Sequence, residues 1–166
     1  MSDNPKKAMA DVELLVQYDQ GRRDFSGISL VGGFFIGVNI PGIILSNANL
    51  EAIRFEAQAV GADGIDPIAK VPPPVRFVGS NLQDCIFRYS NLKRSNFDKA
   101  ILTRTDFSDA NMQGATLIQA QMVGAKLEQA NLKEAYLTQS NCSNSNLKSA
   151  NLDHAKLMGA KLKNVD

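Results

Sequence analysis

The chain has 166 residues, of which 44% are hydrophobic, a length that suits one packed domain and is too short for two ordinary ones. Its eighteen basic and seventeen acidic residues leave a formal charge of +1, which excludes a strong overall field that would steer nucleic acid or acidic partners toward it. The two cysteines and the single histidine form neither a CxxC motif nor a pair at metal-ligand spacing, so we expect no metal site and no cofactor.

Residues 1–24 are expected to form a helical cap. Asn4 and Pro5 are typical of an N-cap followed by proline at the first helical position, and Gly21 is typical of the residue that ends a helix. A helix from about Pro5 to Asp19 would place four residues on one side: Ala8, Val12, Leu15 and Tyr18. We expect this helix to cover the first coil of a solenoid, whose open end would otherwise leave strand groups and core side chains in water.

Residues 25–56 carry a hydrophobic period of five. The larger members, which we interpret as centres that point into a core, are Leu30, Phe35, Ile40, Leu45, Leu50 and Phe55, and Phe25 opens the series. Two residues before each centre lies a partner: Ile28, Gly33, Val38, Ile43, Ala48 and Ile53. A period of five fits neither an α-helix nor a long strand, so the backbone must turn once per unit if all the centres are to face one core.

Four outward positions of this first block are apolar: Val31, Phe34, Ile36 and Ile44. Exposed apolar surface of this kind requires an explanation. Either the N-terminal helix or the next segment covers it, or it binds a partner protein, with Phe34 and Ile36 forming a stripe on the wall that carries Phe35.

Residues 57–74 interrupt the pattern. Phe55 and Phe77 are 22 residues apart, which is not a multiple of five, and one normal step plus a seventeen-residue insertion, about Ala57 to Pro73, accounts for the difference.

This insertion is predicted to be a loop because it contains turn signals at Gly61 and Asp63-Gly64 and a stiff proline run from Pro72 to Pro74. Long loops are often functional, but loop length costs little free energy, so a tolerated insertion is the alternative. Ile65 and Ile68 either pack on the apolar stripe of the first block or contact a partner.

From Val75 to Asp166 the period of five continues through eighteen units without a missed step, with large centres from Phe77 to Leu162 and a small residue two positions before most of them. Units such as SNLKR, ANLKE and ANLDH closely resemble the pentapeptide-repeat family, and the segment QYDQGRRDFSGISL resembles the helix-to-repeat junction of its cyanobacterial members. This resemblance implies an all-β fold: a right-handed quadrilateral β-helix, a solenoid with four units and twenty residues per coil, behind a short N-terminal α-helical cap.

The sequence itself offers a check on a twenty-residue coil. That spacing aligns Phe77 with Phe97 and Phe87 with Phe107. It also aligns one unbroken column of asparagines: Asn91, Asn111, Asn131 and Asn151. We expect such a column to form amide hydrogen bonds along the axis, as side-chain ladders do in stacked strands.

The repeat register leaves no catalytic constellation. His154 falls at an outward corner, where we expect a solvated side chain, and no nucleophile lies in a cleft beside it. Cys85 and Cys142 fall on different walls and are expected to be reduced core thiols. We therefore expect that the protein is not an enzyme.

Two outward features of residues 75–166 are candidate contacts. Three apolar residues gather on one wall: Ile118, Tyr136 and Met158. Three basic residues form a modest strip beside the asparagine column: Lys93, Arg94 and Lys133. A nucleic-acid interface normally needs more phosphate contacts than this strip offers, so we expect another protein as the partner.

A packed, narrow solenoid has no room for a substrate, so function is expected on its walls, its insertion and its ends. The first hypothesis is a non-enzymatic protein–protein interaction module of a bacterium, regulatory or in assembly, as the resemblance implies. We expect it in the cytoplasm, because the N-terminus lacks an apolar stretch long enough for a signal peptide or a membrane span. The alternative is a DNA mimic that interacts with DNA gyrase or topoisomerase, as the resemblance implies for some relatives, but such mimicry requires an acidic surface. Lysines near the last unit favour a monomer, with an end-to-end homodimer through the C-terminal coil as the alternative.

Overall fold

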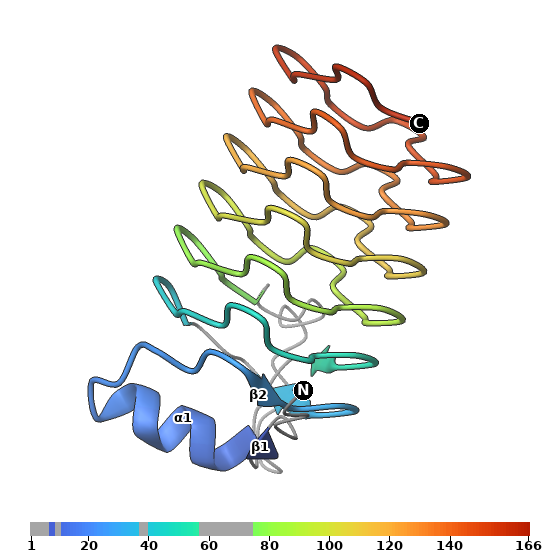
Figure 1. Cartoon of the computed structure of the whole chain (residues 1–166). Helices are drawn as coiled ribbons and strands as arrows, with labels where there is room; N and C mark the ends of the chain where they lie inside the picture. Colours follow the sequence, from blue (N-terminus) through green and yellow to red (C-terminus); the bar gives the residue numbers. More distant parts are fainter. Residues whose placement is uncertain (1–6, 9–10, 37–39, 57–74) are drawn as a thin grey trace, which may run out of the picture.

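A computed structural model describes residues 7–8, 11–36, 40–56 and 75–166. Figure 1 shows a stack of similar coils, with one helix lying across the end that contains the N-terminal part of the chain. The regular elements are short and lie at this end of the stack: β1 (Lys7–Ala8), α1 (Asp11–Asp19), β2 (Ile28–Ser29), β3 (Phe34–Ile36) and β4 (Arg54–Glu56). In the later coils each wall contributes one bridge residue that pairs with the neighbouring coils.

The pairing between coils is parallel and has a period of twenty residues. Asn91 pairs with Asn111 and Asn111 pairs with Asn131, while β3 pairs with β4 through Phe35 and Phe55. Along the chain the bridges recur every five residues, so four walls complete one coil. The predicted coil of four units and twenty residues is therefore confirmed.

A tight turn forms the corner at the end of each unit. In one example the Ala115 amide donates to the Met112 carbonyl oxygen at 2.9 Å, and the third residue of that turn, Gly114, has φ +66°. A left-handed third residue is the signature of a type II turn. Arg94 and Glu134 occupy the same position in the coils on either side, with φ of 57° and 60°, and both side chains are exposed.

Asparagines at the bridge position form more hydrogen bonds to the backbone of these turns than to one another. The side-chain oxygen of Asn131 accepts the backbone amide of Lys133 at 3.1 Å, and that of Asn151 accepts the amide of Asp153 at 2.9 Å, in an Asx arrangement. The predicted amide ladder is confirmed for one pair, in which Asn131 Nδ2 donates to Asn111 Oδ1 at 3.3 Å. The side-chain oxygens of Asn111, Asn131 and Asn151 each accept an amide of their own turn, which limits bonding along the column.

Inward side chains fill the tube. Every centre from Phe77 to Leu137 is at most 1% exposed. The predicted aromatic stacks are both present, because Phe77 lies on Phe97 with ring centroids 5.2 Å apart and Phe87 lies on Phe107 at 5.3 Å. The buried members of the first block are Phe25, Ile28, Leu30, Ile40, Ile43, Leu45, Ala48, Leu50 and Ile53.

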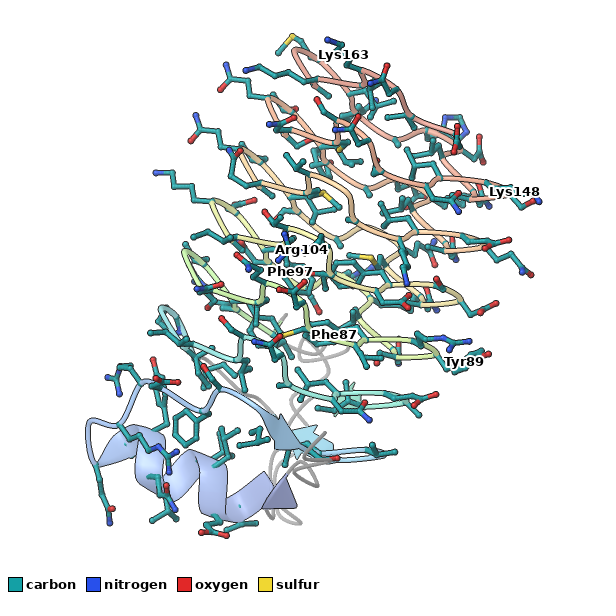
Figure 2. The ribbon with its side chains drawn as sticks, viewed as in Figure 1. Phe87, Tyr89, Phe97, Arg104, Lys148 and Lys163 are labelled. Atoms are coloured by element: carbon teal, nitrogen blue, oxygen red, sulfur yellow. The ribbon has the colours of Figure 1, made fainter. Side chains whose placement is uncertain are left out.

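Figure 2 shows the consequence of this packing: Phe87 and Phe97 lie within the coils, whereas Tyr89 and Lys148 project from an outer edge. A cavity of about 10 Å³ lies between Leu14 of α1 and the centres of the lower coils. This volume is barely enough for one water molecule and far below that of a ligand pocket.

The N-terminal cap differs from the prediction in its start. α1 begins at Asp11, and Lys7–Ala8, which the prediction placed in the helix, forms β1 parallel to Ile28–Ser29 of β2. The reason is that β1 pairs with an edge of the first coil that would otherwise remain open. Among the described residues, no helix has both the length and the apolar character needed to cross a bilayer.

The predicted inner face of the helix is confirmed for Tyr18 and for Leu15, which is partly buried against the core, and it was wrong for Val12. Leu14 and Tyr18, one turn apart, are 1% and 8% exposed, whereas Val12 is 70% exposed. The Tyr18 hydroxyl donates to the Pro41 carbonyl oxygen at 2.7 Å, which fixes the helix against the first coils. The predicted helix end is confirmed, since Gly21 has φ +97° and its amide donates to the Tyr18 carbonyl oxygen at 3.0 Å.

The two repeat blocks stack in register despite the insertion. Ile44 pairs with Asn81 and Asn49 pairs with Ile86, each 37 residues further on, in place of the usual 20. The difference of seventeen residues equals the length predicted for the insertion.

We predict that Leu14→Ala lowers the free energy of unfolding by about 2–5 kcal/mol, because it removes a buried side chain between the cap and the first coils. The control Val12→Ala should change it by no more than about 0.5 kcal/mol, because Val12 is exposed. Urea unfolding followed by circular dichroism measures both. A larger loss for Val12→Ala than for Leu14→Ala would contradict the observed helix face.

Candidate functional site

A groove follows one corner of the solenoid, where two walls meet. The asparagine wall has the bridge residues Asn91, Asn111, Asn131 and Asn151. The tyrosine wall, next along the chain, has the bridge residues Arg76, Asn96, Thr116, Tyr136 and Lys156. The groove, which we call the corner groove, has a volume of about 400 Å³ and is lined by Arg94, Gly114, Glu134, His154, Tyr136 and Lys156.

Gly114 produces a notch in this groove. A Cβ atom built there would meet Cγ of Arg94 at 3.5 Å, an ordinary contact, so the space is open to a side chain. The left-handed backbone does not demand glycine either, since Gln119 and Gln129 adopt φ of 60° and 58° at equivalent turn positions. The effect of glycine at this position is to leave the corner open between Arg94 and Glu134.

The charges in the corner groove lack the pairing seen elsewhere on the surface. Ion pairs between successive coils join residues twenty apart: Arg104 with Asp84 at 2.7 Å, Lys126 with Asp106 at 3.9 Å and Lys133 with Asp153 at 3.5 Å. Within the part of the chain that the structure describes, Arg94, Glu134 and Lys156 form no ion pair. These three exposed side chains are therefore available to a ligand.

The surroundings of the groove are basic. We counted charges in residues 75–166 for the corner column, which contains Arg94, and for the nearest outward-facing column on each wall, which contain Lys93 and Tyr136. These three columns hold five basic residues and two acidic ones: Arg76, Lys93, Arg94, Lys133 and Lys156 against Glu134 and Asp153. The difference of +3 is most of the net charge of +4 that this block carries. The near-neutral charge of the whole chain therefore hides a local excess at one corner.

An apolar surface adjoins the groove on the tyrosine wall. Tyr136, which lines the groove, is 45% exposed, and Met158 is 77% exposed. Ile118, two coils below Met158 in the same column, is half-buried. The three residues predicted as one patch thus lie on one wall, and Tyr136 joins that patch to the groove.

Of the other predicted contacts, the structure describes the side chains of two. Val31 is 56% exposed on a different wall of the first block, and Ile44 is half-buried between its paired coils. Phe34 and Ile36 are part of β3, whose side chains lie outside the described residues, as do Ile65 and Ile68.

The groups with potential chemistry are isolated. The His154 side chain is exposed, as predicted, with Nε2 3.4 Å from Asp153 Oδ1. Both cysteines are buried: the Cys85 thiol donates to the Leu45 carbonyl oxygen at 2.7 Å, and burial raises the pKa of Cys142. Among the described residues no three His, Cys, Asp or Glu side chains gather as they would to hold a metal ion.

Sequence reasoning identified Arg94, Tyr136 and His154 separately and missed the groove that joins them. The signal was present, because corner residues spaced by twenty read Arg94, Gly114, Glu134 and His154. A glycine among charged residues in one corner column marks a notch.

Comparisons with known proteins agree with the repeat architecture. The family model for Pentapeptide repeats matches with eight copies, over residues 76–114, 90–129 and 125–164. Rfr23, a pentapeptide repeat protein from the cyanobacterium Cyanothece 51142, has a similar structure, with a TM-score of 0.59 and 27% identity over 94% of this chain and 98% of that one. A pentapeptide repeat protein of the Arabidopsis thaliana thylakoid lumen has a TM-score of 0.52 and 30% identity over 53% of this chain and 61% of that one.

A search of curated proteins found no match. The matched family folds as a right-handed quadrilateral β-helix, which confirms the predicted fold class, and the matches indicate no enzyme family.

We predict that Asp84→Asn lowers the free energy of unfolding by at most about 1 kcal/mol at neutral pH, since its partner Arg104 is largely exposed. Hydrogen bonds from Arg104 hold the pKa of Asp84 below its ordinary value of 3.8. A carboxylate with a lowered folded-state pKa stabilises the fold above its unfolded-state value, and this contribution is lost as the pH falls through the folded-state value.

Urea unfolding curves of the two proteins should therefore converge as the pH falls below 3.8. Asp109→Asn, which alters a carboxylate without an ion pair among the described residues, is the control. A difference between wild type and Asp84→Asn that persists at the lowest pH would exclude the ion pair as its cause.

Proposed function

Because the chain belongs to the pentapeptide-repeat family, we propose that it is a non-enzymatic module that binds another protein, with the corner groove and the adjoining patch as the main contact. The observation that carries this proposal is the set of groove charges that form no ion pair within the described residues, beside the exposed Tyr136. Binding surfaces commonly combine an aromatic anchor with polar groups that can pair with a partner.

The packing of the tube supports a function on the outer surface. The centres fill the interior, and the cavity near Leu14 is too small for a substrate. An exposed histidine beside one carboxylate, without a nucleophile in a cleft, is not an arrangement that activates a reaction. Binding through the walls is the role that this architecture favours.

The alternative, mimicry of DNA toward gyrase or topoisomerase, is less well supported. A DNA mimic must present acidic groups that follow the phosphate charge, whereas the corner groove lies among five basic and two acidic residues. We therefore keep protein binding through a basic corner as the proposal.

Two further proposals come from the sequence. The insertion at residues 57–74, with Ile65 and Ile68, and the stripe of Phe34 and Ile36 form a second contact surface on the first block. The protein acts in the cytoplasm.

Photo-crosslinking tests the main contact. We expect that a photoreactive phenylalanine analogue in place of Tyr136 crosslinks to a protein in native lysate, because the residue borders the groove. The same analogue in place of Tyr89, which is 54% exposed at another corner, is a matched control.

Mass spectrometry of the adducts gives the readout. A protein recovered from the Tyr136 position and absent from the Tyr89 position would support the proposal. Equal recovery from both positions, or recovery from Tyr89 alone, would exclude the corner groove as the main contact.

A further inference from the structure

We propose that the corner groove binds an extended acidic segment of a partner protein, which lies along the solenoid axis with one acidic side chain near Arg94, a second near Lys156 and a bulky apolar side chain between them over Gly114. This inference rests on the proposed function and adds the chemistry of the partner.

The length of the groove matches such a segment. Arg94 and His154 are three coils apart, which corresponds to about 14 Å at the spacing of paired strands. In an extended peptide, residues i and i+4 point to the same side and are about 13 Å apart. Two acidic side chains four residues apart therefore reach the basic ends of the groove together.

The charged residues of the groove favour acidic groups of the ligand at the two ends and disfavour an acidic group at the middle. Arg94 at one end and Lys156 at the other are exposed and unpaired within the described residues, and Arg76 and Lys93 add positive charge near Arg94. Glu134 lies between the two ends and repels an acidic group at the centre. The favoured ligand is acidic at two points and uncharged or apolar midway.

This arrangement favours a peptide over a nucleic-acid strand. A nucleic acid carries a negative charge on every nucleotide, so a strand lying along the groove would bring a phosphate toward Glu134. A peptide can place its acidic residues at the ends alone. The exposed ring of Tyr136 and the open notch at Gly114 provide a contact for an apolar side chain at the centre.

Fluorescence anisotropy with the full chain tests the proposal. The probe is a labelled nine-residue peptide of Ser and Gly that contains two Asp residues four positions apart and a Leu midway between them. We expect saturable binding that weakens with added salt, as charge contacts at a surface do. Arg94→Glu and Lys156→Glu should each weaken binding about tenfold or more.

Gly114→Gln should weaken binding to a similar degree by filling the notch. Glutamine occupies equivalent left-handed turn positions at Gln119 and Gln129, so the variant is expected to fold. Gly124→Gln is the matched control, because Gly124 has the same φ of +66° and its added Cβ would meet Cγ of Arg104 at the same 3.5 Å, but at another corner. Binding should be unchanged in this control.

Changing the probe tests the role of Glu134. Replacing the central Leu of the peptide by Asp should weaken binding, and Glu134→Gln should recover most of that loss. A labelled nine-residue oligothymidylate should bind more weakly than the original peptide.

The proposal is overturned if Gly114→Gln and Gly124→Gln bind the peptide equally, or if the oligonucleotide binds more tightly than the peptide. Crosslinking at Tyr136 without peptide binding would overturn this ligand chemistry and leave the proposed function standing. Absence of both would overturn the two together.

Discussion

The structure depends on one packing constraint: a large side chain at every fifth position must enter a tube that is only wide enough for the side chains of its own walls. The centres from Phe77 to Leu137 meet this constraint with at most 1% exposure. A turn with a left-handed third residue follows each centre and aims the next one inward. Because four such turns complete a coil, the twenty-residue register is a consequence of the packing.

Because of the twenty-residue register, side chains that are twenty residues apart in the sequence are neighbours in the structure. Arg104 and Asp84 form an ion pair across twenty residues, and Phe77 stacks on Phe97 in the same way inside the tube. The corner groove arises by the same rule, since its lining residues come from four successive coils. On a surface built in this way, a substitution at one corner position changes one level of one column.

Much of the fold could be predicted from the sequence, because the constraint is visible as a period. The centres, the aromatic stacks and the twenty-residue coil all follow from residues that must face inward. Because these side chains share one core, the position of each one restricts the positions of its neighbours. The helical cap was predicted less well. Nine helical residues carry little pattern, and pairing of Lys7–Ala8 with Ile28–Ser29 outcompeted helix formation at the predicted start.

The surface was harder to predict for a physical reason. Outward residues need not be of one type along a column, so the spacing of twenty that relates Arg94 to His154 is not marked by a repeated residue type, and Tyr136 lies on the next wall. The total charge of +1 suggested a surface without a charged patch, whereas folding concentrates basic residues around one corner. The amide ladder shows a related limit, because identical residues in one column bonded to their own turns first.

Hydroxyl-radical footprinting of the protein bound to the partner that it captures would locate the working surface without any substitution. Met158 is 77% exposed and Tyr136 is 45% exposed on one wall, and Tyr89 is 54% exposed at another corner, so all three report on access by solvent. If the corner groove is the contact, oxidation of Met158 and Tyr136 should fall in the complex while oxidation of Tyr89 stays the same. Protection of Tyr89 with unchanged oxidation of Met158 and Tyr136 would place the contact elsewhere and contradict this assignment.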